Sequence, residues 1–254
     1  MLDGYSVLAP VYDRLNDTVD YRKWADFIEA SFEKYSPDKK IKSVLDLGCG
    51  TGSMTIELAE RGYDLVGVDI SDEMLSVADQ RARERGLSGI LYIMADMCSF
   101  ELYGTVDAVV CCLDGINHLD RREDLLACFS LVSNYLEPGG VFLFDLNTPH
   151  KFKTVYSDRD YILEDDGIMC CWRNRLSKSG DTVDFFLTVF EQDEDGAWQR
   201  SDGGHRERAY GLRTISNELE ACGMKLIEVS AGYGFEKPEK DTERWYLAAK
   251  KFEQ

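Results

Sequence analysis

A chain of 254 residues is long enough for one large α/β domain with a buried core, or for such a core carrying an insertion. Its 47 acidic and 29 basic residues give a net charge of −18, which repels a nucleic-acid backbone unless a local basic patch exists, and we find none. The N-terminus lacks the features of a signal peptide, and no apolar run reaches the about 18 residues of a membrane span, so we expect a cytoplasmic protein without membrane contact.

The first 36 residues are rich in aromatic side chains at helix-compatible spacings, which predict one short and one longer helix across the mouth of a ligand site. Apolar runs and glycine stops then predict a core of strands 43–47, 64–69, 91–95, 106–113 and 141–146 and helices 53–61, 72–85 and 121–136. Residues 137–140 predict a turn before the last of these strands. This alternation is typical of a parallel, doubly wound α/β sheet.

The pattern changes after residue 147. Turn residues separate four strand-like runs, at 160–164, 168–176, 182–192 and 197–210, which predict a small inserted antiparallel sheet. A helix at 215–222 and strands at 224–230 and 244–250 return to the α/β pattern. We therefore expect three parts: a helical cap (1–36), a ligand-binding α/β domain (37–147 and 211–254) and an inserted substrate lid (148–210).

A glycine-rich loop follows the first core strand, with Gly48, Gly50 and Gly52 in a G-x-G-x-G arrangement. A pyrophosphate site favours backbone amides with no acid nearby, whereas Asp46 precedes this loop and two later strands end at Asp69 and Asp96. Three carboxylates suit a ligand with ribose hydroxyls, an exocyclic amine and cationic groups. S-adenosylmethionine is such a ligand.

Three segments in order resemble the motifs of class I S-adenosylmethionine-dependent methyltransferases: Asp46-Leu47-Gly48-Cys49-Gly50-Thr51-Gly52, Gly67-Val68-Asp69-Ile70-Ser71 and Ala95-Asp96-Met97. The resemblance covers about residues 40–147. It implies a Rossmann-like fold with a seven-stranded, mostly parallel sheet. It also implies that S-adenosylmethionine is the cofactor and S-adenosylhomocysteine the product.

The resemblance implies roles for individual residues. Asp69 would bind the ribose hydroxyls, and Asp96 the adenine amine beside the Met97 backbone. Asp46 would lie near the methionyl part, although an acid that only holds the glycine loop fits equally. The other implied cofactor residues are Gly48, Cys49 and Gly50 in the loop, Ile70 and Met74 at the adenine, Leu113, and Tyr12 as a cover. The alternatives are a helix cap for Asp69, a turn for Asp96 and a core contact for Met74.

The segment 112–119 follows the fourth strand and resembles the loop of glycine methyltransferase-type enzymes, which ends in His-Leu. It lacks the Asn/Asp-Pro-Pro-Tyr/Phe motif of nucleic-acid amino-methylating enzymes. His118 is a candidate general base, or else a helix-capping or packing residue. We assign Asp114 and Tyr12 to the acceptor as well. Arg208 and Tyr210 share one side of a predicted strand and could bind a polar or anionic acceptor, with Tyr210 as a second catalytic candidate, unless they form only a solvated strand edge.

Eight cysteines without a Cys-x-x-Cys or Cys/His cluster are typical of reduced thiols, so we expect neither disulfides nor a metal site. The pattern predicts an enzyme that transfers a methyl group from S-adenosylmethionine to a nitrogen or oxygen of a small-molecule acceptor. An RNA or protein methyltransferase and a non-catalytic S-adenosylmethionine-binding protein remain alternatives. A homodimer is a candidate assembly, and the sequence specifies neither the acceptor nor the methylated atom.

Overall fold

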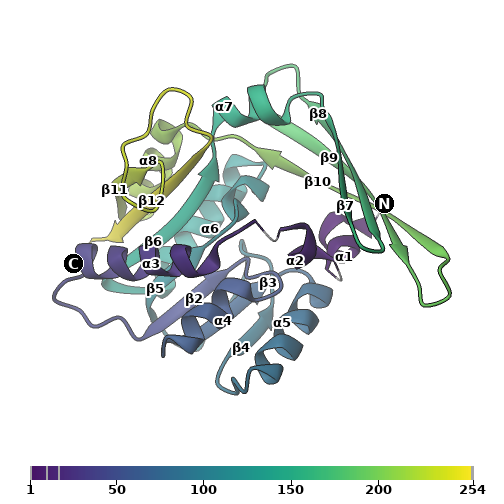
Figure 1. The fold of residues 1–254 in the computed structure, drawn as a ribbon. Helices are drawn as coiled ribbons and strands as arrows, with labels where there is room; N and C mark the ends of the chain where they lie inside the picture. Colours follow the sequence, from purple (N-terminus) through teal and green to yellow (C-terminus); the bar gives the residue numbers. More distant parts are fainter. Residues whose placement is uncertain (1, 10, 17, 253–254) are drawn as a thin grey trace.

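The computed structural model describes residues 2–9, 11–16 and 18–252 and contains two β-sheets (Figure 1). A seven-stranded sheet has the strand order β11-β12-β6-β5-β2-β3-β4, and a five-stranded sheet has the order β1-β10-β9-β8-β7. The chain builds most of the larger sheet, crosses into the smaller one after β6, and returns through α8 to add β11 and β12. The predicted fold class, an α/β sheet with an inserted antiparallel sheet, is confirmed.

The larger sheet contains the parallel strands β2 (Ser43–Leu47), β3 (Asp64–Asp69), β4 (Leu91–Met94), β5 (Val106–Cys111) and β6 (Leu136–Asn147). β12 (Arg244–Lys251) pairs antiparallel with β6, and β11 (Met224–Ser230) pairs antiparallel with β12. β3 and β5 flank β2 on opposite sides, so the order of the strands reverses there. Ligands of open α/β sheets bind at such a switch point, outside the carboxyl ends of the strands.

Helices cover both faces of this sheet because neighbouring strand residues point to opposite sides. Val109 belongs to a buried core with Phe129 of α6, whereas Val110 belongs to a second buried core with Leu58 of α4. The helices that follow or precede these strands are α3 (Tyr21–Tyr35), α4 (Ser53–Glu60), α5 (Asp72–Glu84), α6 (Arg122–Tyr135) and α8 (Leu212–Ala221). The sheet is therefore doubly wound, as predicted.

The inserted sheet contains the antiparallel strands β7 (Asp160–Asp165), β8 (Ile168–Leu176), β9 (Thr182–Gln192) and β10 (Trp198–Arg208). The chain enters it through α7 (Pro149–Lys151) and a π-helical turn, η2 (Phe152–Tyr156). Alternate residues of β9 are buried, from Val183 to Val189, as expected for a strand with one covered face. The division of the chain into cap, α/β domain and lid stays a prediction.

The N-terminal segment differs from the two predicted helices. It forms β1 (Leu2–Asp3), α1 (Gly4–Leu8), α2 (Tyr12–Leu15) and α3, and β1 pairs in parallel with β10 of the inserted sheet. Val7 and Leu8 pack with Leu187 of β9 and Met74 of α5, so α1 lies between the two sheets (Figure 1). The longer helix, α3, packs on the larger sheet instead. Among the described residues, no helix is long and apolar enough to cross a membrane.

Two boundaries of the larger sheet also differ from the prediction. β5 ends at Cys111, because Leu113 and Asp114 adopt left-handed conformations with φ of 58° and 54°, which end an extended strand. A 3₁₀ turn, η1 (Gly115–His118), follows directly.

Residues 137–140 were predicted as a turn, but they lie within β6, where Leu136 already pairs with Val106. A Cβ atom at Gly140 would lie 2.7 Å from the carbonyl oxygen of Asp107. This glycine therefore permits a close approach of two strands rather than a chain reversal.

Candidate active site

A cavity of about 360 Å³ lies at the carboxyl ends of β2, β3, β4 and β5. The structure places at its wall every residue that we predicted to bind the cofactor: Tyr12, Asp46, Gly48, Cys49, Gly50, Asp69, Ile70, Met74, Asp96, Met97 and Leu113. His118 of η1 and His205 of β10 also line it, together with Tyr5 and Tyr21 from the N-terminal segment. The cavity is thus bordered by the glycine loop, the N-terminal segment and the inserted sheet.

The glycine loop brings its backbone close to this cavity. Gly48, Gly50 and Gly52 have φ of 72°, 54° and 75°, a region that side chains disfavour. A Cβ atom at Gly52 would lie 2.9 Å from both Ala78 Cβ and Tyr92 Oη. The loop conformation therefore requires glycine and leaves space that side chains would fill.

The carboxyl group of Asp69 holds the loop in place. Its Oδ2 accepts a hydrogen bond from the Gly50 N–H at 2.8 Å, and its Oδ1 accepts one from the Ser71 N–H at 2.9 Å. Burial raises its pKa, while these amides act in the opposite direction. The N-cap of α5 is Ser71, whose Oγ accepts a hydrogen bond from the Met74 N–H, so Asp69 does not serve as the cap.

Asp46 is the most buried acid of the cavity, with 1% of its surface exposed. Thr55 Oγ1 donates a hydrogen bond to its Oδ2, yet burial raises the pKa of Asp46 to about 7. Asp96, two residues beyond the end of β4, accepts a hydrogen bond from the Cys98 N–H at 2.8 Å. With Asp69 and Asp124, four acids line the cavity, and no lysine or arginine occurs among its described lining residues. The site favours cationic ligands.

Known proteins are similar to this chain in sequence and in fold. A sequence model of the methyltransferase domain matches residues 44–140. The chain is 33% identical over 248 residues to the putative methyltransferase YqeM of Bacillus subtilis, and the match covers 97% of each protein. A crystal structure of an S-adenosylmethionine-dependent methyltransferase from Clostridium acetobutylicum is also 33% identical, with a TM-score of 0.87 over 98% of this chain and 99% of that one.

The chain belongs to the class I S-adenosylmethionine-dependent methyltransferases. The sugar N-methyltransferase KedS8 from Streptoalloteichus shares the fold at 22% identity and a TM-score of 0.74, over 96% of this chain and 93% of KedS8. S-adenosylmethionine is the cofactor of this methyltransferase. The glycine loop, whose backbone borders the cavity, and the acidic lining fit a ligand with a ribose and a cationic methionyl end.

Asp114 of this methyltransferase is not among the cavity-lining residues and pairs with an arginine instead. Arg244 Nη2 donates to Asp114 Oδ1 at 2.8 Å, and Arg244 Nη1 also pairs with Asp145. Burial acts to raise the pKa of Asp114, but the charges of Arg244 and Lys151 and the hydrogen bond from Arg244 together hold the pKa below its usual value. Asp114 therefore belongs to a buried ion-pair group beneath η1 and is not among the cavity-lining residues.

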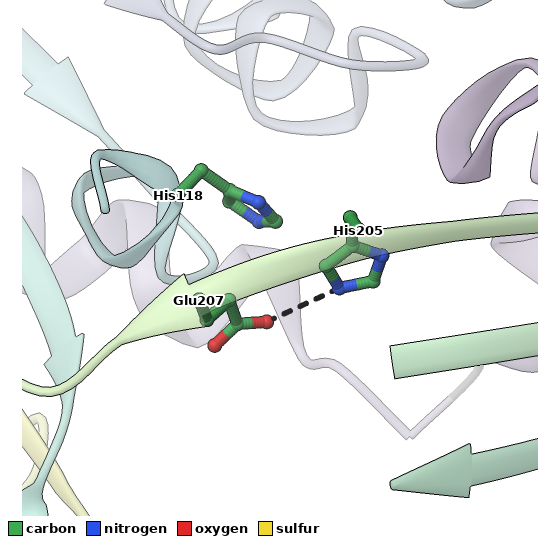
Figure 2. A group of neighbouring side chains, drawn as sticks. All are labelled: His118, His205 and Glu207. Atoms are coloured by element: carbon green, nitrogen blue, oxygen red, sulfur yellow. Dashed lines mark hydrogen bonds and ion pairs between the residues drawn. The ribbon is translucent and has the colours of Figure 1, made fainter. Parts of the chain in front are cut away.

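His118 lies beside a second histidine that our sequence reasoning did not assign to the site (Figure 2). A hydrogen bond of 2.8 Å joins His118 Nε2 and Tyr5 Oη, and the rings of His118 and His205 are 5.0 Å apart. His205 Nε2 lies 3.3 Å from Oε1 of Glu207, which is 2% exposed and whose pKa burial raises to about 8. Strand alternation puts His205 and Glu207 on one side of β10, but no local spacing in the sequence indicates that they approach His118.

Arg208 and Tyr210 are not among the cavity-lining residues. Arg208 Nη2 pairs with Asp181 at 3.3 Å, and the Tyr210 hydroxyl donates to the carbonyl oxygen of Leu119. The alternation of β10 turns His205 toward the cavity, so the opposite face of the strand, which carries Arg208, turns away. Tyr210 follows the end of the strand, where the alternation no longer applies.

Proposed function

We propose that this methyltransferase transfers a methyl group to a nitrogen or oxygen of a small-molecule acceptor. The observation that supports it is a single cavity bordered on one side by the cofactor motifs and on the other by Tyr5, Tyr12, His118 and His205. A macromolecular acceptor would need an open groove, and the net charge of −18 opposes RNA.

We assign the cofactor by its parts. Asp69 would bind the ribose hydroxyls, Asp96 the adenine amine, and Asp46 the ammonium group of the methionyl end. Ile70 and Met74 would flank the adenine and exclude water from it. Met74 is buried and Ile70 is 62% exposed, so Met74 would contact the adenine from the protein interior and Ile70 from the solvent side.

Bound S-adenosylmethionine supplies an electrophilic methyl group on its sulfonium. The protein then needs mainly to align the acceptor and exclude water, which can supply roughly 7 to 11 kcal/mol of the barrier. His118 is placed at the cavity wall, where it could accept a proton from a hydroxyl or ammonium acceptor. Tyr5, hydrogen-bonded to His118, would hold the imidazole in place.

The cofactor assignment is tested by titration calorimetry with S-adenosylmethionine, S-adenosylhomocysteine and NAD. We expect the first two to bind and NAD not to bind. Asp69→Ala should weaken S-adenosylmethionine binding by about 1.5 to 3 kcal/mol, the scale of hydrogen bonds to a charged group. Asp64→Ala, an exposed acid at the other end of β3, is the matched control and should leave the affinity unchanged. Unchanged affinity in Asp69→Ala would remove the ribose role.

The acceptor class is tested with S-adenosylmethionine labelled in the methyl group and offered to metabolite fractions, to RNA and to unfolded protein. We expect label in small molecules, and amino sugars are the first panel, because the structural neighbour KedS8 is a sugar N-methyltransferase. Label confined to RNA or protein would favour the macromolecular alternative. Cofactor binding without transfer to any pool would favour a non-catalytic protein.

A further inference from the structure

The group of His118, His205 and Glu207 brings three metal-binding side chains together from two elements (Figure 2). Each offers one ligand atom, and these three atoms lie within 4.8 Å of one another. Both histidines line the active-site cavity, while Glu207 is buried behind them. An ion bound by these residues would therefore face the part of the cavity that we propose for the acceptor.

The fold holds these three residues at a fixed spacing. His205 and Glu207 are two apart on β10 and so point to the same side of the strand. Asn117, next to His118 on η1, is fully buried and donates through Nδ2 to the carbonyl oxygen of Arg208 at 2.7 Å. This bond joins the turn to the end of the strand and fixes the distance between the two elements.

The spacing is close to that of a coordination shell. Two ligand atoms that each lie about 2.1 Å from one tetrahedral ion are separated by about 3.4 Å. His205 Nε2 and Glu207 Oε1 lie 3.3 Å apart. Because no separation in the group exceeds 4.8 Å, a movement of about 1.5 Å by His118 would complete the tetrahedral spacing.

The charges also favour a cation. Four acids and no described lysine or arginine line the cavity, and Glu207 Oε2 is buried with no partner at hydrogen-bonding distance among the described residues. Two imidazoles with one carboxylate are a donor set that suits Zn²⁺ and related first-row ions. We propose that His118, His205 and Glu207 bind a divalent transition-metal ion, such as Zn²⁺, at the acceptor end of the cavity.

Three protein ligands leave a coordination position open toward the cavity. In that position an acceptor hydroxyl would bind the ion, lose its proton to the buffer more readily, and attack the cofactor methyl carbon through its oxygen. The carbon–sulfur bond then breaks, and its electron pair stays on sulfur. This role rests on the proposed function, and in it His118 binds the ion and no longer accepts the acceptor's proton. Metal binding itself does not rest on the proposed function.

The test is a Zn²⁺ titration of the full chain, from which a chelator has first removed any bound metal. Calorimetry measures the binding directly, and competition with a chromophoric chelator measures it independently. We expect one tight site in the wild type. His118→Ala and Glu207→Gln should each weaken it by at least about tenfold, since even outer-shell changes have effects of that size. His150→Ala, which changes the remaining histidine on α7, is the matched control and should bind as the wild type does. Co²⁺ should give a visible spectrum that Glu207→Gln abolishes.

S-adenosylhomocysteine binding, measured on the same samples, shows whether each variant is folded. Equal Zn²⁺ affinity in the wild type and Glu207→Gln, or no binding by the wild type, overturns the metal site and leaves the proposed function intact. Zn²⁺ binding without any binding of S-adenosylmethionine would support the metal site and contradict the proposed function.

Discussion

Asp46 should make the affinity for S-adenosylmethionine depend on pH. Because burial raises the pKa of its carboxyl group to about 7, this group is largely protonated in the free protein below that pH. The ammonium group of S-adenosylmethionine would bind the ionised form better. Affinity should therefore rise with pH, by at most about tenfold per pH unit for one proton, and level off above about pH 7.

Calorimetry from about pH 5.5 to 8 measures this profile. Asp46→Asn cannot ionise, so it should bind more weakly near neutral pH and show a smaller slope. A slope as steep in Asp46→Asn as in the wild type would assign the pH dependence to another group, such as Asp69.

A substitution of Tyr210 distinguishes between a structural and a catalytic role for this residue. Its side chain is 5% exposed and its hydroxyl donates to the Leu119 carbonyl oxygen, so Tyr210→Phe leaves that oxygen unsatisfied. We expect a loss of about 1 to 2 kcal/mol in the free energy of unfolding, measured in urea, with cofactor affinity unchanged. If stability is unchanged but methyl transfer falls once an acceptor is known, Tyr210 is catalytic as the sequence suggested.

The candidate site could be predicted from the sequence only where its residues form contiguous motifs. Asp46, Asp69 and Asp96 lie at or within two residues of the carboxyl ends of three strands, and parallel strands bring these ends to one edge, so their meeting follows from topology. His205 meets His118 through the pairing of an inserted sheet with a turn, which no local spacing encodes. For the same reason, the approach of Tyr5 to His118 had no sequence signal.

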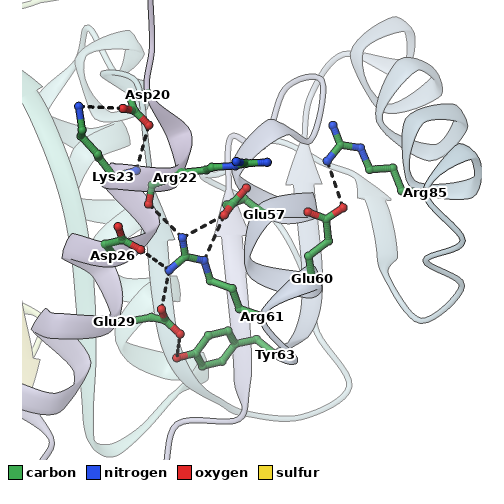
Figure 3. Close-up of polar contacts among 10 residues, drawn as sticks. All are labelled: Asp20, Arg22, Lys23, Asp26, Glu29, Glu57, Glu60, Arg61, Tyr63 and Arg85. Atoms are coloured by element: carbon green, nitrogen blue, oxygen red, sulfur yellow. Dashed lines mark hydrogen bonds and ion pairs between the residues drawn. The ribbon is translucent and has the colours of Figure 1, made fainter.

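At the scale of elements, Arg61 joins α3 to α4 (Figure 3). It follows α4 and donates to Asp26 at 2.7 Å, to Glu29 at 2.5 Å and to Glu57 at 3.0 Å. Its side chain is 20% exposed, and its guanidinium also donates to the carbonyl oxygen of Arg22 at 3.0 Å. One planar cation thus pairs with three acids and joins two helices that pack against the same face of the sheet.

Arg61→Ala should leave these three acids without their shared cation. We expect the free energy of unfolding in urea to fall by about 1 to 3 kcal/mol, less than for a fully buried pair because the group is partly solvated. Arg61→Lys should lie in between, since it keeps the charge but loses the planar fork. The matched control is Arg83→Ala, which removes an exposed pair with Asp79 and should change stability little. A similar loss in both alanine variants would mean that α3 docks through its apolar face alone.

Element types were easier to predict than their ends. The apolar run 106–113 and the alternating apolar residues of 182–192 both predicted strands, and the structure has strands there. The left-handed pair Leu113 and Asp114 ends β5 early. Aspartate tolerates that conformation but leucine disfavours it, so tertiary contacts such as the Asp114–Arg244 ion pair help to select it. The entry of residues 137–140 into β6 likewise depends on pairing with a distant strand.

At the scale of the whole molecule, the inserted sheet was visible in the sequence, but its connection to the N-terminus was not. Leu2 and Asp3 pair with Gly203 and Gly204, and glycines disfavour strands, so nothing local indicated this ladder. Arg14 reinforces the connection through an ion pair of 2.6 Å with Asp165 of β7. The N-terminal segment thereby holds the inserted sheet next to the cavity, which the segment and the sheet both border.

The net charge of −18 sets how the whole protein responds to salt. Repulsion among surplus carboxylates opposes the compact state, and raising the ionic strength from about 0.1 M to 1 M shortens the screening length from about 10 Å to 3 Å. Salt also weakens exposed ion pairs such as Arg14–Asp165, but such pairs contribute only about 0 to 1 kcal/mol each.

We therefore expect relief of the repulsion to dominate, so that the thermal unfolding midpoint at about pH 8 rises by about 2 to 4 °C for each 1 kcal/mol gained. Scans in NaCl and KCl at equal ionic strength should agree, because screening does not depend on which cation is present. A midpoint that falls with salt would show that the ion pairs between the N-terminal segment, the inserted sheet and the helices contribute more than the repulsion costs.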